Sequence, residues 1–455
     1  MTTVKPRGKM VNAFNPDAPS ELSERERQMV EDRHHVLAPS YRLFYQEPVH
    51  IVRGLGTRLW DGDGTEFLDA YNNVVSVGHG RPEVIGAVER QMRQLCTHTR
   101  YLHEGILGYA NDLLGTLRET MPEAQLMFTC TGSEANDLAV RIAKYHTGHE
   151  GVIVTSEAYH GNSDLTAGFS PSLGDRSPLG TWVRQIPAPD SYRIRADDIA
   201  PMMLQQVRSQ IEDLQRRGNG LAAFIVDSIF ASDGIFADPT DFLKPVADLV
   251  HEAGGLFIAD EVQCGFARTG SHMWGHARHH VQPDLMTMGK PMGNGYPVAG
   301  VAARPEVVAE FGYDQRYFNT FGGNTVAMAA AQATLDVILG EELQANSQRV
   351  GALIQAGLND LAAEYEQLGD VRGSGLYIAA ECVTDPETKA PDAQTAAAIV
   401  NGMRKRRVLI SATGPNANVL KIRPPLVFSE QDVDWLLSCL EQTLREDLLA
   451  LVATR

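Results

Sequence analysis

The stretch Thr131–Asn136, which reads TGSEAN, contains residue types that could bind a phosphate. It follows the apolar segment Leu126–Cys130, and Thr131 and Glu134 have the S/T-x-x-E spacing of a capping box, which predicts that a helix starts here. The free N–H groups in the first turn of a helix attract an anion, and Gly132 lets that anion approach the backbone closely. The stretch therefore predicts a phosphate site, and a helix cap that binds no ligand is the alternative.

A second stretch, Phe257–Gln263 (FIADEVQ), predicts a carboxylate at the end of a buried strand. The apolar residues end at Asp260, which places its side chain at the carboxyl edge of that strand. A buried charge without a partner is very costly, so Asp260 needs a cation beside it. The protonated nitrogen of a pyridine ring could be that cation, and an arginine side chain is the alternative.

Lys290 lies in a third stretch, Asp284–Gly295 (DLMTMGKPMGNG), where an apolar run ends among glycines and a proline. Exposed surface lysines rarely have such surroundings. A lysine in a partly desolvated pocket has a lowered pKa and can form a Schiff base with a carbonyl group. A phosphate site, a strand-end carboxylate and a pocket lysine are together the parts that hold pyridoxal phosphate, so we expect this cofactor.

These three stretches need a framework, and the pattern of apolar residues predicts one. Segments with helical periodicity, such as Phe242–Ala253, separate most of the short apolar runs that we expect to be strands. The seven expected strands are Leu126–Cys130, Val152–Thr155, Trp182–Ile186, Ala222–Val226, Leu256–Ala259, Leu285–Met288 and Val298–Ala302. This alternation predicts an α/β fold with a mainly parallel sheet that is covered by helices.

The character of the sequence changes near Gly322, where a long Ala-rich helix is expected over Thr325–Ile338. We therefore expect a large cofactor-binding domain over residues 66–321 and a smaller α+β domain over residues 322–455. The N-terminal segment, residues 1–65, is expected to pack with the smaller domain and to contain a helix over Ser20–Glu31.

The composition excludes several classes of function. The 455 residues include 40 Lys and Arg against 57 Asp and Glu, and the net charge of −17 argues against non-specific binding of nucleic acid. No apolar run approaches the ~18–20 residues of a membrane span, and a signal peptide is absent, so we expect a cytoplasmic protein. Five scattered cysteines predict neither disulfides nor a zinc site. The histidine pairs His34-His35 and His279-His280 lack ligand spacing and are expected at the surface, so no metal is expected.

Five motifs, in order along the chain, resemble those of the class III pyridoxal-phosphate aminotransferases. They are GSEAN, AYHG (Ala158–Gly161), ADEVQ-G-FARTG (Ala259–Gly270), MGKPMGNG and FNTFGGN (Phe318–Asn324). The resemblance runs from about Phe44 to the C-terminus. It implies the fold-type I architecture of this family and a homodimer with shared active sites, and it leaves a tetramer open.

The resemblance also implies catalytic roles for matching residues. Lys290 would form the Schiff base with the cofactor and transfer the proton. Asp260 would keep the pyridine nitrogen protonated, so that the ring can take up electrons. Gln263 would contact the phenolic oxygen of the ring, and Tyr159 would stack on the ring.

Further contacts implied by the resemblance concern the cofactor phosphate. Gly132 and Ser133 would bind this phosphate, and Thr320 would reach the phosphate of the cofactor in the partner subunit. Asp227 is also expected to bind the cofactor, although Asp227-Ser228 stands where the family usually has Glu-Pro.

The chain departs from the transaminase pattern at Lys421, in Val419–Pro425 (VLKIRPP). Many class III transaminases have an arginine at this position that pairs with the substrate carboxylate, and the planar fork of arginine suits that task. Lysine is a point charge that suits a phosphate. The chain resembles instead the phospho-lyases that act on phosphoethanolamine and phosphohydroxylysine, in the stretches Tyr71–His79, Thr99–Glu104, Met288–Ala299 and Arg407–Pro425.

We therefore expect elimination of phosphate from O-phosphoethanolamine, which gives acetaldehyde, ammonia and inorganic phosphate. Candidates for binding the substrate phosphate are Lys421, Arg100 and Arg42, with a solvated surface position as the alternative for Arg42. An ω-amine:keto-acid aminotransferase is the alternative within the family, since Arg53 or Arg423 could supply a carboxylate partner. A protein that binds the cofactor without catalysis would not need Lys290.

Overall fold

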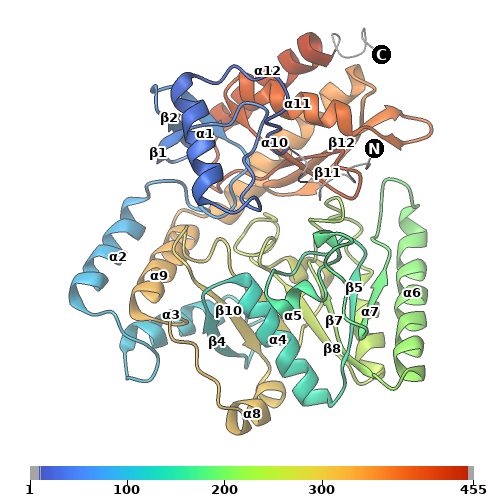
Figure 1. Ribbon diagram of the computed structural model, residues 1–455. Coiled ribbons are helices and arrows are strands. Elements are labelled where there is room, and N and C mark those ends of the chain that lie inside the picture. The colour runs from blue at the N-terminus through green and yellow to red at the C-terminus, as the bar shows by residue number, and fades with distance from the viewer. Residues whose placement is uncertain (1–9, 11, 449–455) are drawn as a thin grey trace.

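Seven strands form one sheet at the centre of the larger lobe of the computed structural model, which describes residues 10 and 12–448 (Figure 1). In spatial order they are β4 (Gln125–Thr129), β10 (Ala299–Ala303), β9 (Leu285–Met288), β8 (Leu256–Asp260), β7 (Leu221–Val226), β5 (Gly151–Thr155) and β6 (Val183–Ile186). β10 runs antiparallel to both of its neighbours, and the other pairs are parallel. The predicted α/β fold with a mainly parallel seven-stranded sheet is confirmed.

Both faces of this sheet are covered by helices, which explains why its strands read as continuous apolar runs. Along β7, Ala223 and Ile225 pack on the side of α4 (Gly132–Thr147), whereas Phe224 and Val226 pack on the opposite side. The helices of the larger lobe besides α4 are α5 (Asp164–Ala167), α6 (Ala196–Arg216), α7 (Leu243–Glu252) and α8 (Pro305–Asp314), with the 3-10 turns η1 (Pro171–Leu173) and η2 (Gly275–His279).

Two further sheets build the smaller lobe, which lies above the larger one in Figure 1. The first contains β1 (Ile51–Leu55), β2 (Arg58–Asp61), β3 (Glu66–Asp69) and β14 (Val408–Leu409). The second contains β11 (Leu368–Ser374), β12 (Tyr377–Asp385), β16 (Val419–Ile422) and β15 (Ser411–Thr413), and β13 (Ala390–Pro391) pairs with β12. Because β3 pairs with β14, strands from the N-terminal and C-terminal parts of the chain share one sheet. The division at residues 65 and 321 stays a prediction.

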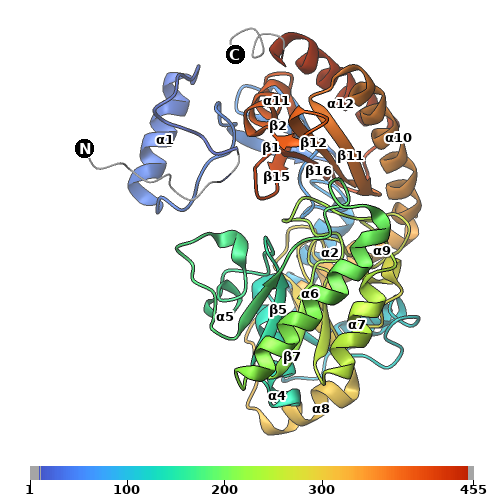
Figure 2. The same ribbon diagram turned by 90° about the vertical axis from the view of Figure 1, so that its right-hand side faces the viewer.

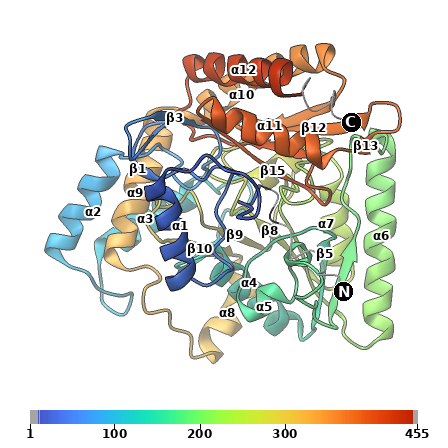
Figure 3. The same ribbon diagram turned by 45° about the horizontal axis from the view of Figure 1, so that its top comes forward.

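Helices α10 (Leu343–Glu364), α11 (Ala393–Lys405) and α12 (Glu430–Thr443) cover the smaller lobe side by side, and the short π-helix η3 (Leu444–Leu448) follows α12 (Figure 3). Helix α9 (Thr325–Gly340) packs against α2 (Pro82–Gln94) and α3 (Glu104–Gly115). Among the described residues, no helix is long and apolar enough to cross a membrane.

Helix α1 spans Glu24–Val36, several residues beyond the predicted Ser20–Glu31. The helix begins after Ser23 because Ser23 and Glu26 form a complete capping box. None of its residues is buried, and Figure 2 shows α1 standing away from the rest of the chain.

We expect Gly351→Ala to destabilise the fold, because an added Cβ on this residue of α10 would lie 2.0 Å from the carbonyl oxygen of Gly375. Overpacking against backbone typically costs about 1–3 kcal/mol. The matched control is Gly312→Ala in α8, where the added Cβ would meet nothing within 4 Å. The control should be neutral or stabilising by about 0.5–1 kcal/mol. Urea unfolding midpoints test this, and equal midpoints for both variants would contradict it.

Candidate active site

A cavity lies where β8 and β9 end and α4 begins. Seven of the eight predicted cofactor residues line it: Gly132, Ser133, Tyr159, Asp227, Asp260, Gln263 and Lys290. The strand order explains the convergence, because parallel strands bring their carboxyl ends to one edge of the sheet.

At one end of the cavity, α4 begins as the sequence predicts. The Thr131 side chain accepts from the backbone N–H of Glu134, and the Glu134 carboxylate accepts from that of Thr131, so the capping box is complete. A Cβ on Gly132 would lie 2.7 Å from Val262, and a Cβ on Gly161 would lie 2.6 Å from Ser133 Oγ. Only glycine fits at both positions, so the cavity floor is bare backbone beside the helix start, as a phosphate site requires.

At the other end, three groups hold the Asp260 carboxylate. Its Oδ2 accepts from Asn136 Nδ2 at 2.8 Å and lies 2.7 Å from His160 Nδ1. Its Oδ1 accepts from the backbone N–H of Val262 at 3.0 Å. Thr287 donates in turn to Asn136 Oδ1 at 2.6 Å, which fixes the amide. The carboxylate is therefore oriented, and Oδ1 can accept from one more donor.

Lys290 follows β9 and lies between these two ends. Burial lowers the pKa of its ammonium group, and the nearby guanidinium of Arg423 lowers it further, against the opposing effect of Asp260. Within residues 12–448 the structure gives this amine no hydrogen bond or ion pair. A buried amine with a lowered pKa is suited to act as a nucleophile and as a base.

Two more cations lie beside the cavity, on and just beyond β16. Lys421 and Arg423 are only 7% and 8% exposed. Arg423 donates to Gln263 Oε1 at 2.7 Å, and its guanidinium lies 4.5 Å from the ring of Tyr71. Burial and the charge of Arg423 hold the pKa of Lys421 well below its usual range. The ammonium of Lys421 lies 5.4 Å from the Tyr377 ring, and the described chain supplies it with no hydrogen bond or ion pair.

Asp227 balances part of this positive charge. Its carboxylate accepts from the backbone N–H groups of Ile229 and Ala231 at 3.2 and 3.0 Å. Burial, together with the charge of Asp260, raises the pKa of Asp227 to about 6. Asp227 is therefore largely ionised at neutral pH, at a short distance from the buried lysines.

The structure places three predicted residues elsewhere. Thr320 is exposed, and it belongs to the same segment as Phe318, on whose ring the Arg100 guanidinium lies at 3.8 Å. Neither Thr320 nor Arg100 lines the cavity. Arg42 is exposed in the segment before β1 and does not line the cavity either. Their roles stay predictions.

The prediction for His279 is wrong. His279 is fully buried, with Nε2 2.9 Å from the Ser228 carbonyl oxygen, and burial lowers its pKa to about 4. His280 and the pair His34-His35 are exposed. Across the described residues, no group of three or more His, Cys, Asp or Glu could hold a metal ion.

Sequence reasoning assigned no role to four residues of the site. Asn136 and His160 hold Asp260, and both stand in motifs that had been recognised, TGSEAN and AYHG. Tyr377 donates to Gln263 Oε1 at 3.0 Å, and Tyr71 lies under Arg423. Tyr71 opens the stretch Tyr71–His79 that resembles the phospho-lyases, but neither tyrosine has a local sequence signal for its contact with Arg423 or Gln263.

The residues fit pyridoxal phosphate on three observations. The glycine-lined helix start matches the phosphate, the free capacity of Asp260 Oδ1 matches a protonated pyridine nitrogen, and the Lys290 amine matches the aldehyde.

Comparisons with known proteins agree with this arrangement. A model of the aminotransferase class-III family matches residues 43–444. A Drosophila melanogaster protein named alanine–glyoxylate aminotransferase 2-like is 37% identical over 96% of this chain and 91% of its own. An ethanolamine-phosphate phospho-lyase homolog from Caenorhabditis elegans is 35% identical over 92% of this chain and 93% of its own. A phospholyase from Arthrobacter, solved in complex with phosphoethanolamine, superposes with a TM-score of 0.88 at 40% identity over 92% of this chain and 99% of its own.

We expect Lys290, and not Lys421, to react with pyridoxal phosphate, because only Lys290 lines the cavity. Both amines are buried with lowered pKa values, so the two lysines provide a matched comparison. Borohydride reduction of the cofactor-loaded protein followed by peptide mass spectrometry should find the label on Lys290. Lys290→Ala should lose the label and Lys421→Met should keep it. A label on Lys421 in the unmodified protein would contradict the assignment.

Proposed function

The chain belongs to the class III aminotransferase family, and we propose that it is a pyridoxal-phosphate-dependent phospho-lyase that eliminates phosphate from O-phosphoethanolamine. The observation that carries the proposal is the buried Lys421 ammonium, which lies near Lys290 and has no anionic partner in the described chain. The similarity to a phospholyase that was solved with phosphoethanolamine supports the same reaction.

Lys421 and Arg423 together suit a phosphate better than either suits a carboxylate. A desolvated ammonium is costly unless an anion accompanies it. A phosphate bound at Lys421 would raise the pKa of that amine again, since an opposite charge favours the charged form. Arg423 already donates through Nη1 to Gln263, while its Nε is buried without a partner. The substrate phosphate would therefore satisfy two cations that the protein leaves incompletely paired.

The cofactor, held by Gly132, Ser133, Asp260 and Lys290, supplies an electron sink for a substrate amine that is joined to it. The Lys290 amine would remove a proton from the substrate carbon that bears nitrogen. Its lowered pKa makes it a competent base near neutral pH. Asn136 and His160 keep Asp260 oriented while charge moves through the site.

Elimination then breaks the bond between the neighbouring carbon and the phosphate oxygen. Because the phosphate is already an anion in the bound substrate, Lys421 and Arg423 would hold it both before and after the bond breaks, and their contribution is to substrate binding. Hydrolysis of the released unsaturated amine consumes one water and gives acetaldehyde and ammonia. The reaction needs no keto acid, because no amino group is left behind.

A class III ω-amine:keto-acid aminotransferase is the second candidate, and Arg423 is the observation that favours it. Its guanidinium donates to Gln263, which lines the cavity, and could bind a substrate carboxylate there. Arg53, the other arginine considered, lies on β1 with its guanidinium 3.8 Å from the Trp60 ring and does not line the cavity.

We also propose that the active protein is a homodimer, in which Thr320 of each subunit completes the cofactor phosphate site of the other. Thr320 does not line the cavity of its own chain. It stands between exposed aromatic residues, because Phe318 and Phe321 are 37% and 69% exposed, and Leu102 nearby is fully exposed. Such an apolar surface suits burial against a second subunit.

The first test measures phosphate release from phosphoethanolamine by the cofactor-loaded protein without a keto acid. Sustained release with acetaldehyde and ammonia is expected. Lys421→Ala should raise KM about 10- to 100-fold, the worth of a hydrogen bond to a charged group. The exposed Lys405→Ala is the matched control and should leave KM unchanged. Turnover with an amine and pyruvate but no phosphate release would contradict the proposal and favour the aminotransferase.

A complementation experiment tests the shared site. Lys290→Ala and Thr320→Asp should each be inactive, the second because its carboxylate repels the cofactor phosphate. If Thr320 acts across the interface, mixed dimers contain one site with both residues intact, so co-expression should restore part of the activity. Co-expression without any recovery would show that Thr320 acts within its own chain.

A further inference from the structure

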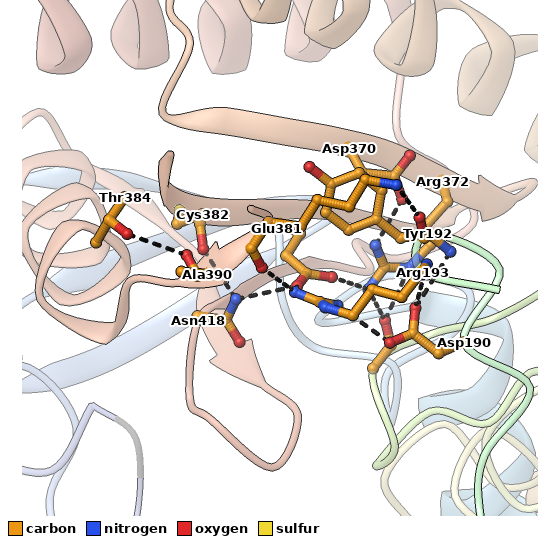
Figure 4. Close-up of polar contacts among 12 residues, drawn as sticks. Asp190, Tyr192, Arg193, Asp370, Arg372, Glu381, Cys382, Thr384, Ala390 and Asn418 are labelled. Carbon is orange, nitrogen blue, oxygen red and sulfur yellow. Dashed lines mark hydrogen bonds and ion pairs between the residues drawn. The ribbon is translucent and has the colours of Figure 1, made fainter. Parts of the chain in front are cut away.

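A buried carboxylate joins the two lobes at a distance from the cavity. Glu381 on β12 is 2% exposed and lies between two arginines (Figure 4). Its Oε1 accepts from Arg193 at 2.6 Å and from Asn418 at 3.2 Å, and its Oε2 accepts from Arg372 at 2.8 Å. Burial alone would raise the pKa of Glu381, but the guanidinium groups of Arg372 and Arg193 lower it. We name these four residues the Glu381 cluster.

The Glu381 cluster forms hydrogen bonds between the smaller lobe and the loop that follows β7. Arg372 donates to the Ile235 carbonyl oxygen at 2.9 Å and to that of Gly234 at 2.7 Å, in addition to Glu381. Arg193 reaches Glu381 from the segment before α6, which belongs to the larger lobe. Each arginine therefore crosses between the lobes, and Glu381 is the carboxylate that both share. Arg193 also pairs with Asp190 at 3.1 Å, and Arg372 also pairs with Asp370 at 2.6 Å.

The loop that Arg372 holds also carries part of the active site. It runs from Asp227, which lines the cavity, to Ala237. Phe230 and Ile235 have left-handed backbone conformations, with φ of 51° and 64°. Such a conformation is strained for a β-branched residue and persists only where the surroundings hold it in place. The two hydrogen bonds from Arg372 are such a constraint.

The face of β12 that carries Glu381 continues onto Lys421, a residue proposed to bind the substrate phosphate. Tyr377 and Glu381 stand four residues apart on β12, so they share one face of the sheet about 14 Å apart. Between them lies Ala379, whose partner on β16 is Lys421. This face packs on the loop, since Tyr377 and Ala379 form one apolar cluster with Ile229, Ala231, Ile235 and others.

We propose that Glu381 is a positioning residue. It fixes the distance from Asp227, on the loop after β7, to Lys421 on β16 and Arg423 just beyond that strand. The inference rests on the proposed function, because it assigns the substrate phosphate to that end of the cavity. Residues of the larger lobe hold the cofactor end of the site, through Asp260, Gly132 and Lys290. The Glu381 cluster therefore governs how tightly the substrate phosphate binds, and Asp260, Gly132 and Lys290 lie outside the loop that it holds.

The test compares Glu381→Gln with a matched control in the purified, cofactor-loaded enzyme. Glutamine keeps the shape and removes the one charge that Arg193 and Arg372 share, while Asp190 and Asp370 still pair with each arginine separately. We expect KM for phosphoethanolamine to rise about 10-fold while kcat changes less than about 3-fold, as a displaced binding group predicts. The control is Asp432→Asn, which removes an equally buried carboxylate paired with Arg58 at 2.6 Å inside the smaller lobe. The control should leave KM unchanged.

If the variant were only less stable, the apparent kcat would fall in proportion to the fraction of folded protein and KM would not change. A rise in KM with little change in kcat therefore indicates a loss of positioning and not of stability. If Glu381→Gln does not fold, Arg193→Gln removes one arm of the cluster from its more exposed side and should raise KM by a smaller factor. An unchanged KM in the folded variants, or an equal rise in Asp432→Asn, overturns the proposal.

Amide hydrogen exchange tests the same inference without any turnover. Residues 229–237 and 419–423 should exchange faster in Glu381→Gln than in Asp432→Asn. Equal exchange in both variants overturns the role of Glu381. An unmodified enzyme that releases no phosphate overturns the proposed function, and the exchange comparison still decides whether Glu381 positions the loop and β16.

Discussion

The active site depends on one buried carboxylate, that of Asp260 at the end of β8. A desolvated charge in the centre of an α/β sheet is tolerated only when neighbouring donors surround it. Those donors come from three places in the chain: Asn136 on α4, His160 after β5 and the backbone of Val262. Meeting this single requirement sets α4 against the sheet, and so it places the helix start that would hold a phosphate at a fixed distance from Asp260.

The buried amines beside the cavity, unlike Asp260, have no partners of opposite charge bonded to them in the described chain. Asp260 is surrounded by donors, whereas Lys421 and Lys290 are buried with no anion bonded to them in the part of the chain that the structure describes, and the nearby Asp227 carboxylate contacts neither amine. The protein thus bears the desolvation cost of two amines, which lowers both pKa values. That cost is recovered when a ligand brings negative charge. For Lys290 the lowered pKa is itself useful, because a base must be neutral before it accepts a proton.

Local signals made most of the framework predictable from sequence. The seven strands are short apolar runs with clear ends, and Thr131 with Glu134 marks the start of α4, so the cavity residues at those ends followed directly. Contacts between distant segments left no such signal. Nothing near His279 indicates that it packs under the Ser228 carbonyl, and nothing near Glu381 indicates that Arg193 and Arg372 converge on it. Both are consequences of how packed elements meet.

The two lobes divide the site between them. Asp260, Lys290 and Gly132 belong to the seven-stranded sheet and its helix, whereas Lys421 belongs to β16 of the smaller lobe. Arg423 and Tyr377 of the smaller lobe both donate to Gln263 Oε1, which joins the two sets directly. A substitution on β16 would therefore change whether the site binds a phosphate or a carboxylate, and Asp260 and Lys290 would stay in place. Under the proposed function, elimination of phosphate and amino-group transfer would both begin with proton removal by Lys290, and the residue at position 421 would select between a phosphate and a carboxylate.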